Sequence, residues 1–242
     1  MDKPRLTVTE TMHGGSTIVS PTTYTTTVHC ELKPYPFPEG MEIPRLMPYQ
    51  EYPWNGDGYL AGEVLRLKKA HGLEVAIETG TCLGSTLCWL VKTFPFHVRS
   101  YEVNDAWGYI AKERLHLIDL SDPPMIDLCR ESSATGFEMV DTDGCADRTL
   151  VFLDAHWGDQ CPLSDELEAI AKQGAKPCIV IHDFQVPGTD FGYDKMPDGR
   201  PFNLDLVREH LNAIYGVGGW KHNYPTKVEG ANRGWISIEP VR

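Results

Sequence analysis

The sequence predicts a doubly wound α/β fold, in which a mostly parallel sheet carries helices on both faces. After residue 58, short apolar runs alternate with segments whose apolar residues repeat at helical spacing. Two of the runs, TLVFLD (149–154) and PCIVIHD (177–183), are rich in β-branched and aromatic residues and are bounded by turn residues. A glycine turn, ETGTCLGST (78–86), directly follows the first run and opens a helix. In such sheets ligands bind outside the carboxyl ends of the strands.

The first half of this region contains three expected strands and three expected helices. The first helix carries Leu60, Val64 and Leu67 on one face and ends near His71-Gly72. The second has Leu83, Leu87, Leu90, Val91 and Phe94 on one face, and the third runs through Ala111 to Ile118. The expected strands are EVAIE (74–78), VRSYEV (98–103) and the weaker MIDLC (125–129).

The second half adds two helices and a hairpin. We expect Pro162 at the first position of a helix with a stripe of Leu163, Leu167 and Ile170. Asn203 can cap a helix that stops at Gly216. The segments GWKHNYP and RGWISIEP near the C-terminus predict a closing antiparallel hairpin, and no internal repeat is visible.

Residues 1–57 form a region of different composition, which we interpret as an arm preceding a domain at 58–242. Its first part is rich in Thr, which favours strand, and its second part is rich in Pro, which forbids a long helix. The arm is either a loosely ordered tail or a segment that covers the active site or pairs with another subunit. The last alternative would make the protein a homodimer.

Composition excludes several functional classes. The chain has 242 residues and a formal net charge of −12, so a nonspecific nucleic-acid binder is disfavoured. The seven cysteines are odd in number and dispersed without a CxxC pair, which is typical of a reducing compartment. The N-terminus lacks the apolar region of a signal peptide, and no run of about 18 apolar residues occurs. We therefore expect a cytoplasmic protein with no membrane partner.

The glycine turn and the end of the next strand predict an adenosine-type ligand. Gly80 allows a tight turn close to a ligand, and Gly84, Ser85 and Thr86 present amides and hydroxyls at a helix N-terminus. The full GxGxxG pattern of a dinucleotide site is absent. Glu102 follows 22 residues after Gly80, about where an acid binds ribose in a nucleotide-binding unit. A purely structural turn and a solvated acid are the alternatives.

Acidic and imidazole side chains follow the two strongest strands. FLDAHWGD contains Asp154 and His156, and VIHDF contains His182 and Asp183. If these strands are neighbours, the four side chains converge on one crevice. Asp oxygens with at most one imidazole suit Mg²⁺ or Mn²⁺, which could orient a substrate hydroxyl while His156 or His182 removes its proton. Alternatively, Asp154 caps a loop and His182 is a core histidine.

A third cluster is the loop VPGTDFGYDKMPDG (186–199), which is rich in Gly, Pro and Asp and long enough to be functional. Its Asp190, Tyr193 and Asp194 could reach a substrate. An ordinary exposed loop is equally compatible with this composition.

These motifs resemble those of class I S-adenosylmethionine-dependent methyltransferases, over roughly residues 60 to 185. The resemblance rests on ETGTCLGST, YEV, FLDAHW and VIHDF, and is strongest to the macrocin O-methyltransferase and cephalosporin-biosynthesis methyltransferase branch. It implies a Rossmann-like, seven-stranded sheet with a methyl donor held around Gly80 and by Glu102. It also implies an adenine beside residues 131–133 and a divalent metal on Asp154 and Asp183.

The chain departs from that branch at two places. The branch has an acidic pair where this chain has His182-Asp183, which weakens the metal inference. The arm has no counterpart, so the acceptor is not carried over.

The leading hypothesis is an S-adenosylmethionine-dependent methyltransferase that acts on a hydroxyl of a small or sugar-like acceptor. Its expected donor-binding residues are Glu78, Gly80, Thr81, Gly84, Ser85, Thr86, Glu102, Ser133 and Asp154. Its expected catalytic residues are His156, His182 and Asp154, and its expected metal ligands are Asp154, His182 and Asp183. The alternatives are a metal-dependent oxidoreductase or hydroxylase on the same fold and a non-catalytic nucleotide-binding protein.

Overall fold

The computed structural model describes residues 7–12, 22–27, 52–140, 144–156 and 160–241. The Pro-rich part of the predicted arm, between Pro34 and Pro48, lies outside the described residues.

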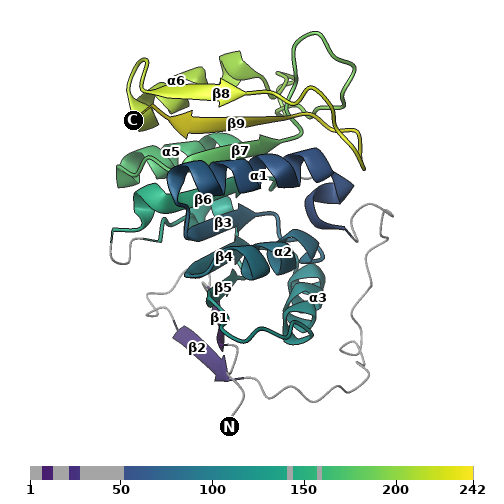
Figure 1. The fold of residues 1–242 in the computed structure, drawn as a ribbon, viewed down its shortest axis with the longest axis vertical. Coiled ribbons are helices and arrows are strands. Elements are labelled where there is room, and N and C mark those ends of the chain that lie inside the picture. The colour runs from purple at the N-terminus through teal and green to yellow at the C-terminus, as the bar shows by residue number, and fades with distance from the viewer. Residues whose placement is uncertain (1–6, 13–21, 28–51, 141–143, 157–159, 242) are drawn as a thin grey trace.

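One sheet forms the centre of the molecule, as predicted, and helices cover both of its faces (Figure 1). The strand order is β2-β1-β5-β4-β3-β6-β7-β9-β8. Seven of these strands form the expected mostly parallel sheet with an antiparallel C-terminal pair: β3 (Val75–Thr79), β4 (His97–Tyr101), β5 (Met125–Cys129), β6 (Thr149–Leu153), β7 (Cys178–His182), β8 (Trp220–Asn223) and β9 (Trp235–Pro240).

Two further strands from the N-terminal region extend the sheet beyond this set. The strand β1 (Thr7–Met12) pairs in parallel with β5, and β2 (Thr22–Thr27) pairs antiparallel with β1. The described sheet therefore has nine strands, two more than the resemblance implies.

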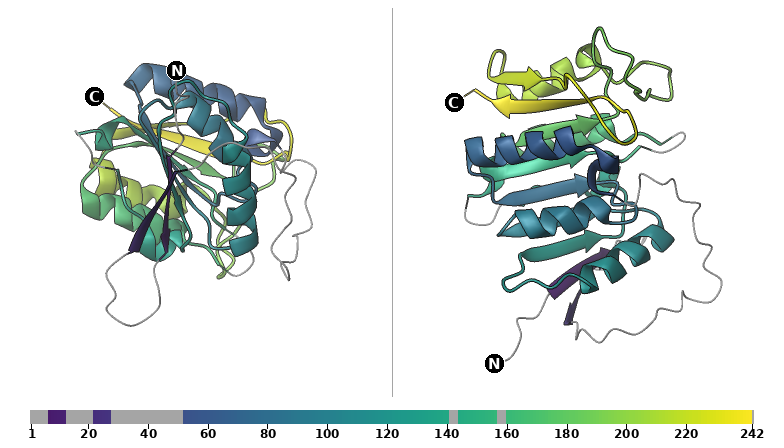
Figure 2. Two further views of the ribbon diagram at one scale, coloured as in Figure 1. Left: turned by 90° about the horizontal axis from the view of Figure 1, so that it is seen from below. Right: turned by 45° about the vertical axis from the view of Figure 1, so that its right-hand side comes forward.

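The helices divide between the two faces, as Figure 2 shows. On one face lie α1 (Gly58–His71), α2 (Ser85–Thr93) and α3 (Asp105–His116), which share one apolar core with the sheet. On the other lie α5 (Leu163–Gln173) and α6 (Leu204–Tyr215), with a second core. The short helix α4 (Ser133–Gly136) contacts α5. The central strands β3, β6 and β7 are buried along their whole length, which explains why they read as continuous apolar runs.

Local chemistry sets most helix boundaries where the sequence predicts them. Asn203 caps α6 by accepting a hydrogen bond from the Leu206 amide, and Gly72 ends α1 in a left-handed conformation. Pro162 lies one residue earlier than expected, because α5 begins at Leu163. Within the described part of the chain, no helix has the length and apolar character needed to cross a membrane.

The segment before α1 ties the N-terminal region to the rest of the domain. A short 3₁₀ helix, η2 (Pro53–Gly56), buries Trp54 against the rings of Trp89 and Phe152. The Asp57 carboxylate caps α1 and accepts a hydrogen bond from the buried indole of Trp235 on β9. These contacts fix the position of Asn55 near the carboxyl ends of the parallel strands.

Candidate functional site

A cavity of about 1060 Å³ opens at the carboxyl ends of the parallel strands. The chain crosses from one face of the sheet to the other between β3 and its neighbour β6, so the cavity lies at the topological switch point. Gly80 follows β3, Glu102 follows β4, residues 131–134 follow β5, and Asp154 follows β6 along its wall. The glycine turn with Glu102 and the acidic group after β6 and β7 therefore line the same cavity.

The glycine turn is held tightly between two strand ends. The amides of Gly80 and Thr81 donate to the carbonyl oxygen of Tyr101, over 3.0 and 3.1 Å. Gly80 has a φ of +78°, and a Cβ placed there would lie 2.4 Å from the carbonyl oxygen of Asp154. Only glycine fits this position, because the close neighbours are backbone atoms that cannot rotate away.

Glu102 lines the cavity at the end of β4. One of its carboxylate oxygens accepts from the Cys82 amide and the other from the Asn104 amide, each over 2.7 Å. Burial raises the pKa of Glu102, and these backbone amides oppose the rise. Each carboxylate oxygen has a second lone pair, so further hydrogen bonds to a ligand remain available.

Two of the expected donor-binding residues lie behind the turn and do not line the cavity. Glu78 is 1% exposed and accepts from the Ser100 hydroxyl over 2.6 Å, and that hydroxyl also contacts Thr81. Burial raises the pKa of Glu78 to about 8. These buried side chains support the turn from within the protein.

The start of α2 is used for packing within the protein. Gly84 lies against Ala111 of α3, where an added Cβ would come within 2.7 Å of the alanine Cβ. The Ser85 hydroxyl accepts from Arg114, and the Thr86 hydroxyl accepts from the Trp54 amide over 2.9 Å. None of the three residues at 84–86 is among the cavity-lining residues.

The segment after β5 lines the cavity and covers a buried acid. Ser133 donates from its hydroxyl to Glu166 of α5 over 2.6 Å. Burial raises the pKa of Glu166 to about 7, while hydrogen bonds from Ser133 and Thr79 lower it. Ser133 thus lines the cavity, while its hydroxyl is used by Glu166.

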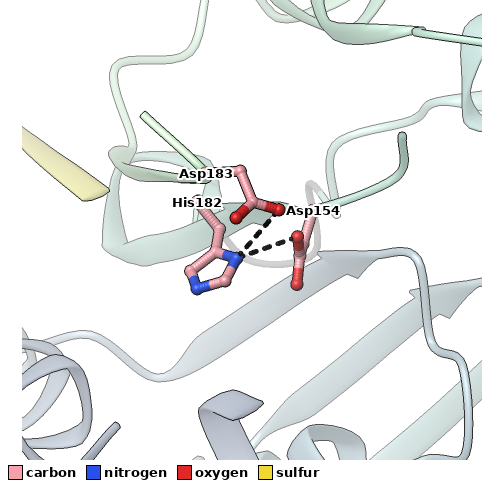
Figure 3. Close-up of side chains that lie close together, drawn as sticks. All are labelled: Asp154, His182 and Asp183. Atoms are coloured by element: carbon pink, nitrogen blue, oxygen red, sulfur yellow. Dashed lines mark hydrogen bonds and ion pairs between the residues drawn. The ribbon is translucent and has the colours of Figure 1, made fainter. Parts of the chain in front are cut away.

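The second predicted group converges as expected from the pairing of β6 with β7. Figure 3 shows the His182 imidazole directed toward two carboxylates, with its Nδ1 at 3.1 Å from Asp154 Oδ1 and 3.5 Å from Asp183 Oδ2. Burial lowers the pKa of His182, but the charges of Asp154 and Asp183 outweigh it and raise that pKa well above its usual value. Asp183 has a φ of +55°, a conformation uncommon for a non-glycine residue.

His156 occupies the other side of Asp183. Its Nε2 lies 2.6 Å from Asp183 Oδ2 and 3.0 Å from Asp194 Oδ2. Burial lowers the pKa of His156, but hydrogen bonds to these two carboxylates outweigh it and raise the pKa to about 10. The two carboxylates therefore favour the protonated form of His156.

The loop 186–199 contributes one of its three candidate residues to the site. Asp194 lines the large cavity, whereas Tyr193 lines a separate cavity of about 520 Å³. Asp190 is exposed and lines neither of these two cavities. Of the three residues, only Asp194 therefore lies beside the acidic group after β6 and β7.

The cavity is also lined by Arg233 and Asn55, which the sequence did not predict. Arg233 lies two residues before β9, and its guanidinium contacts both Asp183 and Asp194. Asn55 lines the cavity from η2 with a φ of +52°, next to Trp54 at +58°. Neither position belongs to a motif, and only the left-handed turn chemistry of the Asn-Gly pair could have drawn attention to Asn55.

The residues after β6 and β7 fit a divalent cation by their donor chemistry. Asp154, His182 and Asp183 each offer one ligand atom, and these atoms lie within 4.8 Å of one another. Two carboxylate oxygens and one imidazole nitrogen suit a hard or borderline ion. His156, Asp183 and Asp194 form a second such group, which shares Asp183 with the first.

Comparisons with known proteins give structural similarity alone. No family model matches the chain, and no curated protein matches it. A Bacillus cereus O-methyltransferase solved in complex with SAH is 15% identical, with a TM-score of 0.47, over 76% of this chain and 81% of that chain. An amino pentose methyltransferase from Micromonospora echinaspora, solved with SAM bound, is 16% identical, with a TM-score of 0.44, over 76% and 90%. The O-methyltransferase TomG from Streptomyces achromogenes, in complex with SAM, is 14% identical, with a TM-score of 0.47, over 76% and 80%. Similarity of this extent assigns no activity or ligand to the chain.

Proposed function

We propose that the protein is an S-adenosylmethionine-dependent methyltransferase that methylates a hydroxyl of a small or sugar-like acceptor. The observation that carries the proposal is the cavity at the switch point, which joins two chemically different ends. One end has the tight turn at Gly80 and the acid Glu102, and the other has the group of Asp154, His182 and Asp183. Residues 58–242 would form the catalytic domain and residues 1–57 the arm.

The donor would lie along the ends of β3, β4 and β5. Gly80 would let the backbone approach it closely, Glu102 would accept from its ribose hydroxyls, and Ser133 would lie beside its adenine. Glu78 and Thr81 would act by holding the turn in place. We assign residues 84–86 to the packing of α2, because their side-chain contacts are internal.

The charge of the cavity supports a cationic donor. Among the residues that line it, the acids outnumber the bases: Glu102, Glu131, Asp154, Asp165, Asp183 and Asp194 against His156, His182 and Arg233. A sulfonium ion entering this space would meet a favourable potential, and the interaction strengthens as water is excluded.

The chemistry required of the protein is alignment and removal of one proton. The acceptor oxygen forms a bond to the methyl carbon as the carbon–sulfur bond breaks, and the electron pair of that bond stays on sulfur as a neutral thioether. The hydroxyl proton would pass to Asp154, whose Oδ1 receives the His182 hydrogen bond. His156 and His182 would hold Asp183 and Asp154 in position through the contacts described above.

We keep divalent-metal assistance as part of the proposal. Asp154, His182 and Asp183 would hold Mg²⁺ or Mn²⁺, and the ion would supply orientation and acidification of the acceptor hydroxyl. Binding would require His182 to give up the proton on Nδ1, because a metal ligand must present a lone pair.

Calorimetric titration with S-adenosylmethionine and with its demethylated product tests the proposal. We expect the wild-type protein to bind both, and Glu102→Ala to bind at least tenfold more weakly. Glu138→Ala is the matched control, because Glu138 has a 77% exposed side chain and does not line the cavity. If the wild-type protein binds neither compound, the proposed methyltransferase function is excluded.

A further inference from the structure

Four side chains at the acceptor end of the cavity form a closed ring of alternating charge. Asp183 contacts Arg233 Nε through Oδ1 and His156 Nε2 through Oδ2. Asp194 contacts Arg233 Nη2 through Oδ1 and His156 Nε2 through Oδ2. All four carboxylate oxygens therefore contact a nitrogen of Arg233 or His156.

The ring joins parts of the chain that are distant in sequence. His156 follows β6, Asp183 follows β7, Asp194 belongs to the loop after β7, and Arg233 precedes β9. Figure 1 shows the segment after β7, in green, and the segment before β9, in yellow, on the same side of the sheet. The ring thus links these segments at the wall of the cavity.

The backbone fixes the approach of Arg233 to the two acids. The amide of Gly192 donates to the Asn232 carbonyl over 2.9 Å, and the amide of Gly234 donates to the Gly192 carbonyl over 2.8 Å. A Cβ at Gly192 would lie 2.9 Å from Arg233 Cδ, so glycine leaves room for the arginine side chain. The Asp194 amide donates to the Asp183 carbonyl over 2.8 Å, which keeps the two acids adjacent.

This geometry affects any cation that would use Asp183. The candidate ligands Asp154, His182 and Asp183 share that residue with the ring, and its two oxygens already face Arg233 and His156. The guanidinium is always charged, and a second cation a few ångströms away would be repelled by it. A divalent ion and Arg233 therefore compete for the same carboxylate.

We propose that Arg233 is a positioning residue that occupies the counter-ion position of this site, so that a divalent cation binds tightly only when the guanidinium withdraws from Asp183 and Asp194. Its importance for catalysis rests on the proposed function, whereas the competition is a property of the ring itself. A purely structural role for Arg233 predicts the opposite effect, because removing it would loosen Asp183 and weaken cation binding.

Titration with Mn²⁺, followed by electron paramagnetic resonance of the free ion, tests the competition. We expect Arg233→Gln to bind Mn²⁺ at least tenfold more tightly than the wild-type protein. Arg233→Lys, which keeps the positive charge, should restore the weak binding. The matched control is Arg200→Gln, because Arg200 is exposed and its described ion pair is with Asp198; its Mn²⁺ affinity should equal that of the wild-type protein.

Unchanged or weaker Mn²⁺ binding in a folded Arg233→Gln variant would overturn the proposal, as would absence of binding in both proteins. Thermal unfolding of the same samples reports whether the variant is folded. Titration of the wild-type protein with S-adenosylhomocysteine separates the two ideas, because absence of binding contradicts the proposed function and leaves the ring result standing.

A second measurement uses only the wild-type protein, so it does not depend on whether Arg233→Gln folds. The Arg233 Nε–H resonance, assigned by nuclear magnetic resonance, should move from an ion-paired to a solvated position as Mg²⁺ saturates the site. A resonance that stays unchanged under Mg²⁺ concentrations that saturate the protein would overturn the proposal.

Discussion

Replacement of Gly80 by alanine tests the tight turn to which we assign donor binding. The new Cβ would lie 2.4 Å from the Asp154 carbonyl oxygen, 2.9 Å from its carbonyl carbon and 3.1 Å from the Ala155 Cα. All three are backbone atoms, so relief requires the end of β6 to move. We expect a cost of about 1–2 kcal/mol for the left-handed conformation and about 1–3 kcal/mol for the overlap.

Gly174→Ala is a matched control for this variant. Gly174 has a φ of +72°, close to that of Gly80, but no heavy atom lies within 4 Å of its added Cβ. Its cost should therefore be the conformational one alone, about 1–2 kcal/mol, partly offset by the reduced freedom of the unfolded chain. The difference between the two variants isolates the contact with Asp154.

Urea unfolding followed by tryptophan fluorescence gives both free energies, and titration with S-adenosylhomocysteine gives the effect on the site. Gly80→Ala should be less stable than Gly174→Ala by about 1–3 kcal/mol and should lose at least tenfold in affinity, because the overlap shifts the turn against the strand end. Equal stability of the two variants, with unaltered affinity, would contradict a steric overlap between the added Cβ and the Asp154 backbone.

Three further predictions concern residues around the site. With a pKa of about 8 when folded, Glu78 holds its proton over a pH range in which the unfolded chain has lost it, so its contribution to stability falls as pH rises toward 8. Glu78→Gln lacks this dependence. The unfolding free energy of the variant minus that of the wild type should therefore rise by about 1.4 kcal/mol per pH unit between about pH 5.5 and 7.5, as measured by urea titrations. Asp57→Ala should cost about 2–4 kcal/mol in the same assay, because it removes a helix cap and leaves the buried Trp235 indole without its acceptor; a loss below about 1 kcal/mol would contradict this. Thr86→Val should change the calorimetric affinity for S-adenosylhomocysteine less than twofold, because the Thr86 hydroxyl serves the Trp54 amide; a tenfold loss would return Thr86 to the donor site.

The parts of the fold that follow from local patterns were predictable from the sequence. Continuous apolar runs gave β3, β6 and β7, and the pairing of β6 with β7 brought Asp154 and His182 together as expected. Strand boundaries were less predictable, because a strand ends where its hydrogen bonding to the neighbouring strand stops. The expected strand 98–103 is in fact His97–Tyr101, which leaves Glu102 just outside the strand, at the cavity wall.

The remainder of the site depends on contacts that no local pattern encodes. Arg233 lies 50 residues from Asp183, and it reaches the acid because backbone pairing with Gly192 carries it there. The start of α2 has the glycine and hydroxyl residues of a ligand-binding helix end, but the Trp54 turn packs against it and uses the Thr86 hydroxyl. That turn comes from the N-terminal region, whose composition gave no sign of such a contact.

The central claim is that the switch-point cavity is a donor site for methyl transfer. A crystal structure of the protein with S-adenosylhomocysteine tests it most directly. We expect ribose hydroxyls on the Glu102 carboxylate, adenine beside residues 131–133 and the sulfur directed toward Asp154. A nucleoside bound elsewhere on the protein, or a cavity that stays empty at saturating ligand, would contradict it.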